Sequence, residues 1–200
     1  MISINPENPQ PRLLAQVVEV LENGGVIAYP TDTTYGIGCD IRNTRAIERI
    51  YRIKNKSSKD TLSFICADLS HLADYAVVDT AGFRLMKRLL PGPYTFVLRA
   101  TKEPPRALQT RQKTVGIRVP DHPIPLALVR MLGRPIVSTT ANISGGPPLT
   151  NPEDISDRFG PGLDLVVDGG DIPGELSTVV QVQDGAVTVL REGKGMEELL

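Results

Sequence analysis

The chain of 200 residues contains no tryptophan, and aromatic residues of all kinds make up only 4% of it. Hydrophobic residues still account for 40%, so a sizeable core is available, but it has to be built from valine, isoleucine, leucine and alanine. A chain of this length and composition is typical of one globular domain. We therefore expect a single domain over residues 1–200.

Only two cysteines and two histidines are present, which limits metal and redox chemistry. Cys39 and Cys66 form no metal-ligand pattern, and we expect free thiols rather than a disulfide. His71 and His122 are too few for a site of several histidine ligands, so no such metal site is expected. His71 lies at a polar helix start, where a surface position is favoured. His122 lies between prolines and is more typical of a turn than of a general base.

Long apolar runs are also missing. No segment approaches the roughly 20 apolar residues that a membrane-spanning helix needs. The first twelve residues are polar and rich in proline, unlike a signal peptide. The phosphate-binding pattern G-x-x-x-x-G-K-S/T and the dinucleotide pattern G-x-G-x-x-G after a strand are both absent. We expect a cytoplasmic protein without a membrane partner, which holds any nucleotide by other means.

The net charge of −1 hides a strong asymmetry. Residues 42–59 hold seven basic residues and one acid, and residues 84–118 hold nine basic residues and one acid. Residues 145–200, in contrast, hold eleven acids and three bases. If the two basic segments share a face, that face suits an anionic ligand such as ATP or RNA. Solvated helix faces explain the same pattern, and charge alone does not separate the two interpretations.

The hydrophobic periodicity predicts an α/β fold. Asp184-Gly185 between two apolar runs is a strong hairpin signal, so part of the sheet has to be antiparallel. Interleaved helices and strands then favour a mixed sheet. Helices are expected near residues 13–21, 46–51, 83–90, 124–132 and from 152, and strands near 26–29, 62–66, 94–99, 114–119, 136–139, 165–168, 178–183 and 186–190.

Two blocks more than a hundred residues apart carry the clearest chemistry. They are Pro30–Gly38, which reads PTDTTYGIG, and Ser138–Gly145, which reads STTANISG. Each follows a strand-like run and offers hydroxyls, a carboxylate or amide, and glycines that let a ligand approach the backbone. Together with cations, such groups suit the binding of phosphates and carboxylates better than acid–base chemistry. The blocks therefore predict a small-molecule site at the ends of two strands.

Several basic residues are candidates for that site. Lys54 and Lys56 follow an amphipathic helix and are spaced to converge on one anion, although a solvent-facing loop is the alternative. Arg118 lies in an apolar strand and needs an anionic partner if it is buried, while an edge position would let it reach solvent. Arg191 either clamps a phosphate or pairs with the neighbouring Glu192.

Taken in order, these segments resemble the YrdC/YciO family. The resemblance extends from Tyr29 to Gly193, and the segment Asn5–Gln10 and the helix at Phe83–Lys87 are most similar to the YciO branch. It implies a YrdC/RibB-like α/β fold, with a twisted mixed sheet and flanking helices around a large cationic cavity, and without an additional C-terminal domain. The matching blocks read YPTDTTYGIG, KNK, LPGPYTFVL, VGIRVPDHP, STTANISG, VDGG, STVV and VLREG.

The resemblance also implies an activity. Synthase members of the family condense L-threonine, bicarbonate and ATP into threonylcarbamoyl-AMP, releasing pyrophosphate. Mg²⁺ would accompany ATP through the phosphate oxygens, and no prosthetic group is expected. The product would pass to a threonylcarbamoyl-transferase complex for N6-threonylcarbamoyladenosine formation at position 37 of tRNA. Some members bind double-stranded RNA or tRNA, so RNA binding with weak or altered synthase activity is the alternative function.

The family motifs assign roles to particular residues. Threonine would contact Thr33, Arg118, Ser138 and Ser177. ATP would contact Lys56, Asp60, Thr114, Thr140 and Arg191. The catalytic blocks would contribute Lys54, Lys56 and Asn142, which orient phosphates.

The chain departs from the family pattern mainly on the nucleotide side. The usual K-x-R reads Lys54-Asn55-Lys56 and loses the bidentate fork of arginine. Asp60 stands at an amide position, and a histidine usual in the next strand is replaced near Ile65. The usual P-S-A-N reads Thr139-Thr140-Ala141-Asn142, and S-P-T reads Pro148-Leu149-Thr150. These changes imply reduced synthase activity, or a different acid or nucleotide.

Overall fold

The computed structural model describes residues 1–55, 62–102, 104, 108, 113–143 and 145–199. In this part of the chain the strands are β1 (Ile2–Ser3), β2 (Val26–Tyr29), β3 (Gly36–Asp40), β4 (Ser63–Ile65), β5 (Ala76–Val77), β6 (Tyr94–Ala100), β7 (Thr114–Arg118), β8 (Ile136–Thr140), β9 (Leu165–Asp168), β10 (Thr178–Gln183) and β11 (Ala186–Arg191). The helices are α1 (Pro11–Glu22), α2 (Thr44–Ile53), α3 (Leu72–Tyr75), α4 (Thr80–Leu89), α5 (Pro123–Leu132), α6 (Pro152–Phe159), the 3-10 helix η2 (Gly160–Gly162) and α7 (Met196–Leu199).

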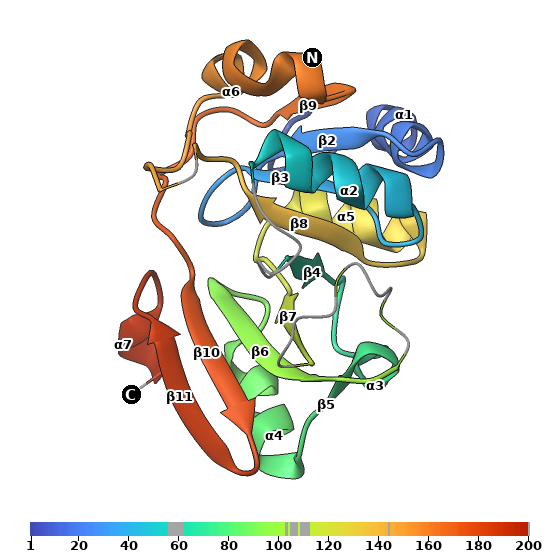
Figure 1. Ribbon diagram of the computed structural model, residues 1–200. Coiled ribbons are helices and arrows are strands. Elements are labelled where there is room, and N and C mark those ends of the chain that lie inside the picture. The colour runs from blue at the N-terminus through green and yellow to red at the C-terminus, as the bar shows by residue number, and fades with distance from the viewer. Residues whose placement is uncertain (56–61, 103, 105–107, 109–112, 144, 200) are drawn as a thin grey trace.

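The strands join into one mixed sheet (Figure 1). Their order is β1-β9-β2-β3-β8-β4-β7-β6-β10-β11, and β5 pairs with β6 outside this path. Neighbours β2 and β3, β3 and β8, β6 and β7, and β10 and β11 are antiparallel, whereas β4 and β7, and β6 and β10, are parallel. The predicted mixed α/β fold and the hairpin at Asp184-Gly185 are confirmed.

Side-chain caps mark where α2, α4 and α6 begin. The side chain of Asn43 accepts a hydrogen bond from the backbone of α2, and that of Asp79 does the same for α4. Asn151 accepts from the first turn of α6, as its position before a proline predicts. These caps satisfy backbone N–H groups that have no partner within the helix. At the other end of α5, Gly133 takes the left-handed conformation, with φ +70°, that ends many helices.

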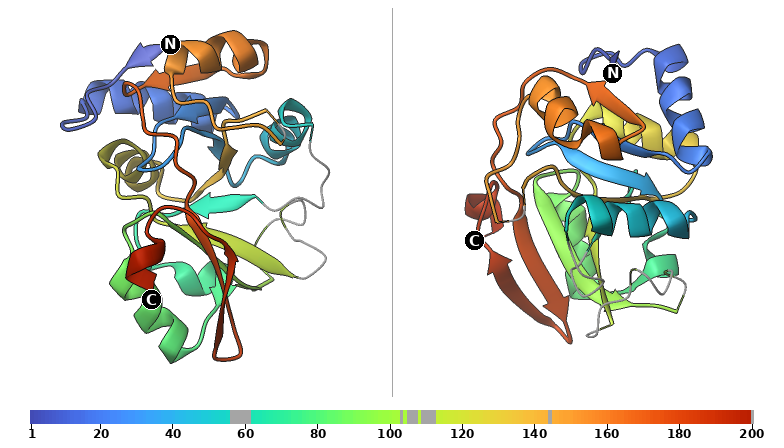
Figure 2. Two further views of the ribbon diagram at one scale, coloured as in Figure 1. Left: turned by 90° about the vertical axis from the view of Figure 1, so that its left-hand side faces the viewer. Right: turned by 45° about the horizontal axis from the view of Figure 1, so that its top comes forward.

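Helices cover both faces of the sheet around β2, so this strand is buried on both sides. In β2, Ile27 and Tyr29 point into a core shared with α1 and α5, whereas Val26 and Ala28 point into the core shared with α2 and α6. The alternation follows from the two-residue repeat of a strand. α1 and α5 pack against each other on their face, as Figure 2 shows. The aliphatic core that the composition predicts is therefore divided by the sheet.

The sequence patterns missed β3. Its segment, Gly36-Ile37-Gly38-Cys39-Asp40, has two glycines that weaken a strand in isolation. In the folded chain both glycines are required, because β3 runs between β2 and β8 with a large ring beside it. A Cβ on Gly38 would lie 2.7 Å from Ile136 Cγ2 and 3.0 Å from Tyr29 Cε1. The last three residues of the first sequence block, Gly36–Gly38, therefore belong to a central strand rather than to a loop.

An ion pair ties β3 to the segment that precedes β8. Both carboxylate oxygens of Asp40 accept from Arg134, Oδ1 at 3.0 Å from Nε and Oδ2 at 2.6 Å from Nη2. Asp40 is only 3% exposed. This carboxylate, together with Glu22, raises the pKa of the Arg134 guanidinium.

No helix among the described residues is both long and apolar enough to cross a bilayer.

We expect Asp40→Ala to lower the free energy of unfolding by about 3 kcal/mol, because it leaves Arg134 without its buried partner. Glu22→Ala is the matched control. Its carboxylate lies 3.8 Å from the same guanidinium and is half exposed, so it should cost less than about 1 kcal/mol. Urea unfolding of the three proteins checks this, and equal losses for the two variants would contradict the assigned role of the Asp40 pair.

Candidate functional site

An open cavity of about 310 Å³ lies on one face of the sheet, between the ends of β2 and β8 and the strands β4, β7, β6 and β10. Two arginines, Arg118 and Arg191, contribute to its wall. Most of its remaining polar lining consists of hydroxyl groups, which come from Thr31, Thr34, Ser63, Thr95, Thr114, Ser138, Thr139, Thr140 and Ser177.

Strand alternation explains why the cavity is polar and hollow. In β7, Val115 and Ile117 belong to the core, while Thr114, Gly116 and Arg118 line the cavity. The same alternation places Ser63 of β4 in the wall and its neighbour Phe64 in the core. Small residues at the wall positions leave the volume open.

Glycines bring the cavity floor close to its neighbours. A Cβ on Gly116 would lie 2.9 Å from Ser63 Oγ, and a Cβ on Gly36 would lie 2.9 Å from Ser138 Oγ. Any side chain at either position would displace a hydroxyl group of the wall.

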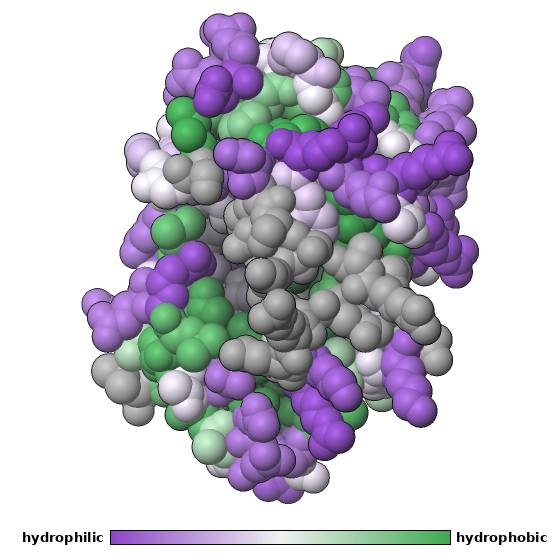
Figure 3. Space-filling view, in the orientation of Figure 1, coloured by the Kyte–Doolittle hydropathy of each residue, from purple (hydrophilic) through white to green (hydrophobic). Residues whose placement is uncertain are grey.

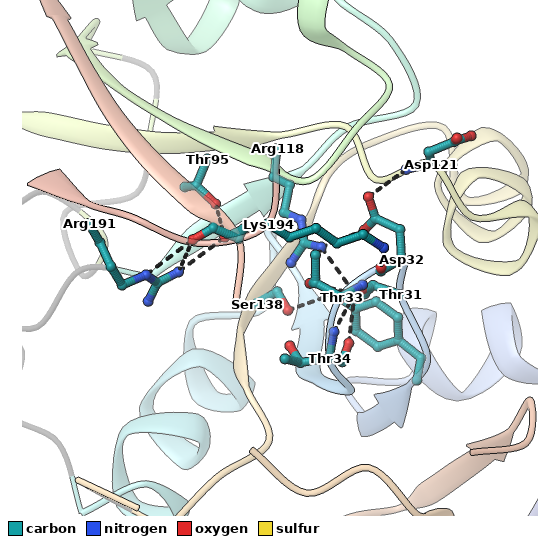
Figure 4. A network of polar contacts seen from close by, with 12 residues as sticks. Thr31, Asp32, Thr33, Thr34, Thr95, Arg118, Asp121, Ser138, Arg191 and Lys194 are labelled. Atoms are coloured by element: carbon teal, nitrogen blue, oxygen red, sulfur yellow. Dashed lines mark hydrogen bonds and ion pairs between the residues drawn. The ribbon is translucent and has the colours of Figure 1, made fainter. Parts of the chain in front are cut away.

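Arg118 is held by the first sequence block (Figure 4). Its Nη2 donates to Asp32 Oδ1 and Thr33 Oγ1, each at 2.5 Å, and to Thr31 Oγ1 at 3.1 Å. Arg118 is 8% exposed, and β7 lies between β4 and β6, so the edge position considered from the sequence is wrong. Its buried Nε has no hydrogen-bond partner among the described residues. The guanidinium therefore keeps donor capacity beyond its internal ion pair.

The loop that carries Asp32 is itself fixed at several points. Thr31 Oγ1 donates to the carbonyl oxygen of Thr34 at 2.6 Å and accepts from the backbone N–H groups of Thr33 and Thr34. Lys194, which follows β11, donates through Nζ to the carbonyl oxygen of Asp32 at 2.9 Å. A segment near residue 194 thus braces a loop near residue 32.

Ser138 is oriented from behind by Tyr29. The phenol hydroxyl donates to Ser138 Oγ at 2.6 Å, and the tyrosine is fully buried. Burial raises the pKa of Tyr29 to about 12, an effect that the hydrogen bond to Ser138 partly offsets. Because Tyr29 donates, the proton of Ser138 is available to an acceptor in the cavity.

Arg191 contacts Ser177 rather than Glu192. Its Nη2 donates to the carbonyl oxygen of Ser177 at 2.8 Å and to its Oγ at 3.1 Å. Ser177 Oγ also lies 3.1 Å from Thr95 Oγ1. Partial burial lowers the pKa of Arg191, and the positive charge of Arg118 lowers it further. Two guanidinium groups thus repel each other across the same cavity, which favours a bound anion.

Lys54 and Asn142 form a contact beside this cavity. Lys54 Nζ donates to Asn142 Oδ1 at 2.5 Å and to its carbonyl oxygen, and lies 5.7 Å from the centre of the Phe159 ring. Lys54 is 2% exposed, so a solvent-facing loop is wrong for it. Asn142 Nδ2 donates to the carbonyl oxygen of Gly146 at 2.9 Å. The predicted convergence of Lys54 with Lys56 is not tested, because Lys56 lies outside the described residues.

The structure thus gathers most of the residues predicted from the sequence. Lys54 and Asn142 contact each other at the end of β8, and Asp60, like Lys56, lies outside the described residues. The others line the cavity or contact its wall: Thr33, Thr114, Arg118, Ser138, Thr140, Ser177 and Arg191.

Sequence reasoning missed several residues of the site. Thr31, Asp32 and Thr34 stand within the first block, and that block was itself the signal that pointed to them. Ser63 and Thr95 carry no local signal, because a serine or threonine in a short apolar run is unremarkable in sequence. They reach the cavity only through strand pairing.

Other expectations concern residues away from the cavity. His122 caps α5, with its Nδ1 accepting from the backbone of Ile124, and the side chain of His71 is 83% exposed. Cys39 and Cys66 are free and buried, and burial raises the pKa of both thiols. No group of three or more His, Cys, Asp or Glu residues in the described part of the chain is placed to hold a metal ion.

The cations of α2 and α4, one helix from each basic segment, do not share one end of the molecule. α2 lies above the centre of Figure 1, where the surface in Figure 3 is largely hydrophilic. The cations of α4 belong to a helix at the opposite end of the molecule, as both Figure 1 and Figure 2 show. Charge alone favoured an anionic ligand such as RNA only if the two basic segments share a face, and these two helices do not.

Comparison with known proteins agrees with this geometry. The family model for Sua5, YciO and YrdC, whose description reads telomere recombination, matches residues 19–193. The chain belongs to this family. It is 45% identical over 194 residues to the uncharacterized protein YciO of Escherichia coli K12, covering 96% of this chain and 94% of that protein. It is 37% identical over 196 residues to the threonylcarbamoyl-AMP synthase of Bacillus subtilis 168, covering 95% of this chain but only 55% of the synthase.

Solved structures of the family have the same fold. The crystal structure of E. coli YciO superposes with a TM-score of 0.94 at 43% identity, covering 99% of this chain and 97% of that one. The crystal structure of P. abyssi Sua5 complexed with L-threonine superposes with a TM-score of 0.91 at 29% identity, covering 100% of this chain and 61% of that one. The expected family and its fold, a mixed sheet with flanking helices, are thereby confirmed.

Buried phenols in and around the site predict a loss of stability at alkaline pH. Burial raises the pKa of Tyr29, Tyr35 and Tyr94 to about 12 from the ordinary 10.0. In the unfolded chain they ionise near pH 10, so the folded state binds more protons between pH 10 and 12. Their stabilising contribution is full below pH 10 and is lost as the pH rises through 12.

The free energy of unfolding should therefore fall across this range by up to about 1.4 kcal/mol per pH unit for each such tyrosine. Tyr29→Phe should remove the contribution of one tyrosine to this decline. At neutral pH it should lower the free energy of unfolding by about 1 kcal/mol, because the hydrogen bond to Ser138 is lost. Urea unfolding at a series of pH values measures both effects. A stability that stays constant from pH 10 to 12 would show that these phenols ionise freely in the folded protein.

Proposed function

We propose that the chain is an L-threonylcarbamoyladenylate synthase-like nucleotidyltransferase. It would condense L-threonine, bicarbonate and ATP into threonylcarbamoyl-AMP and pyrophosphate, for threonylcarbamoylation of tRNA. The observation that carries the proposal is the pair of guanidinium groups, Arg118 and Arg191, in one hydroxyl-lined cavity. One of them, Arg118, has a carboxylate partner within the described residues. A cavity of this kind suits a ligand with a carboxylate and a phosphate.

Threonine would bind where β2 and β7 end. Arg118 lines the cavity beside its contacts to the loop, and its positive charge suits the threonine carboxylate. Thr33 and Ser138 lie close by and offer hydroxyls that the amine or side chain of threonine can use. Asp32 would remain on Arg118 and keep the guanidinium in place. The relative from P. abyssi crystallised with L-threonine supports this choice of amino acid.

ATP would occupy the rest of the cavity. Thr114 and Thr140 offer hydroxyls there, and Arg191 offers a charge-assisted donor for a phosphate oxygen. Ser177, which the family motifs assign to threonine, receives three hydrogen bonds from Arg191, so it would lie where the two substrates meet. Lys56 and Asp60 stay predictions from the sequence. Lys54 and Asn142 would orient the phosphates from the rim.

The proposed chemistry depends on positioning. The threonine nitrogen attacks the bicarbonate carbon, and a carbamate and water are formed. A carbamate oxygen then attacks the α-phosphorus of ATP, the bond from that phosphorus to the bridging oxygen breaks, and pyrophosphate leaves. Mg²⁺ bound to the phosphate oxygens would neutralise part of the charge. The protein would hold the two substrates in line and stabilise the phosphate charge through its cations and hydroxyls.

We expect the purified protein to release pyrophosphate from ATP only when both threonine and bicarbonate are present. Arg118→Ala should lower kcat/KM for threonine by about 10- to 150-fold, because a hydrogen bond to a charged group contributes about 1.5–3 kcal/mol. Arg118→Lys keeps the charge but loses the bidentate fork. Its kcat/KM for threonine should lie between those of the wild type and Arg118→Ala, and the variant should remain folded. The assay follows pyrophosphate and the adenylate product.

Arg130→Ala is the control, because this exposed arginine of α5 lies outside the cavity and should leave kcat/KM unchanged. An Arg118→Ala variant that is folded and fully active would refute the proposed carboxylate site. A folded wild type without turnover would refute the synthase activity. Salt-dependent binding of double-stranded RNA or tRNA by that inactive protein would then favour the alternative, an RNA-binding member of the family.

A further inference from the structure

Ser63 occupies a central place on the cavity floor. It lies in β4, where it pairs with Ser138 of β8 on one side and with Gly116 of β7 on the other. In β7, Gly116 stands two residues from Arg118 and two residues from Thr114, on the same face of the strand. Ser63 is therefore paired with the position midway between Arg118, which is proposed for threonine, and Thr114, which is proposed for ATP.

Among the residues that the structure describes, none occupies the hydroxyl of Ser63. No hydrogen bond to Ser63 Oγ is formed by any residue in the described part of the chain, and the residue lines the cavity. By contrast, the neighbouring Ser138 Oγ is held by Tyr29, and Ser177 Oγ is held by Arg191. Gly116 has no side chain that could cover Ser63, whose Oγ would lie only 2.9 Å from a Cβ there.

We propose that Ser63 is a further substrate-contacting residue, whose hydroxyl donates a hydrogen bond to the carbamoyl–phosphate junction of threonylcarbamoyl-AMP. The inference rests on the proposed function. The junction is the group that links the amino acid to the nucleotide, so it has to lie between the two ends of the site. Ser63 keeps its own proton throughout and takes part in no bond making or breaking.

A hydrogen bond from Ser63 to this junction would stabilise threonylcarbamoyl-AMP more than it stabilises bound threonine or bound ATP. Threonine alone and ATP alone each lack the carbamoyl–phosphate bond. A donor at that point is therefore used most fully in the transition state and in the product. Interactions of this type raise kcat rather than lower KM. Ser63 would thus contribute to the rate of adenylate formation with little effect on the binding of either substrate.

The test compares the wild type with Ser63→Ala and Ser63→Thr in two measurements. The first is steady-state pyrophosphate release with varied threonine and ATP. The second is equilibrium binding of three probes, namely threonylcarbamoyl-AMP, threonine and ATP. Ser63→Ala should lower kcat and the affinity for threonylcarbamoyl-AMP by about tenfold each, and should change the KM values and the affinities for threonine and ATP less than threefold. Ser63→Thr, which keeps the hydroxyl, should restore most of both losses.

Ser156→Ala on α6 is the matched control for removal of a serine hydroxyl away from the cavity, and it should behave as the wild type. The inference is overturned if Ser63→Ala matches the wild type, or if it weakens all three probes equally. A wild type that is inactive and binds none of the probes would overturn the proposed function together with the inference. If the wild type is inactive but binds threonylcarbamoyl-AMP, selective weakening by Ser63→Ala supports the inference without the synthase activity, and unchanged binding refutes it.

Discussion

Arg118 is a charged side chain within the interior of a sheet, and the arrangement of the site depends on how its charge is held. An unpaired guanidinium in such a place would be costly. The cost is reduced by Asp32 and by two threonines that follow β2, which bring the loop of residues 30–35 over the end of β7. The internal carboxylate satisfies one nitrogen and leaves Nε without a partner in the described residues. Arg118 also lines the cavity, where its positive charge suits an anionic ligand.

The cavity itself arises from side-chain size on one face of the sheet. The central strands carry large apolar residues on the face toward the α2 and α4 side, including Phe64, Phe96 and Ile117. On the opposite face the same strands carry glycine, serine and threonine, so the wall is thin and rich in hydroxyls. Because side chains alternate along each strand, the same strands form a close-packed core on one face of the sheet and an open polar cavity on the other. Enlarging Gly116 would displace the Ser63 hydroxyl on the cavity floor.

The residues that the family motifs assign to threonine and to ATP differ in how far they follow the family pattern. Of those assigned to threonine, Thr33 and Arg118 contact each other in the folded chain. Those assigned to ATP carry the sequence departures, among them Lys56 in place of an arginine and Asp60 in place of an amide, two residues outside the described part of the chain. Lysine keeps the charge of arginine but offers no bidentate fork to a phosphate. Family membership, which 37% identity to a threonylcarbamoyl-AMP synthase and the match to YciO establish, is compatible with an altered nucleotide preference.

The sequence by itself determined the mixed α/β class, most helices and strands, the cap at Asn151 and the two polar blocks, because these depend on local periodicity and on motifs. It also marked Arg118 and Ser138 as site residues through their neighbours in the chain. Only the tertiary structure decided that Gly36–Asp40 forms a central strand, that Asp32 partners Arg118, and that Ser63 lies on the cavity floor. Each of these depends on pairing between segments distant in sequence. Such pairing leaves no local signal, because the sequence around a serine or a glycine does not show whether the residue lies in a loop, in the core or in a binding site.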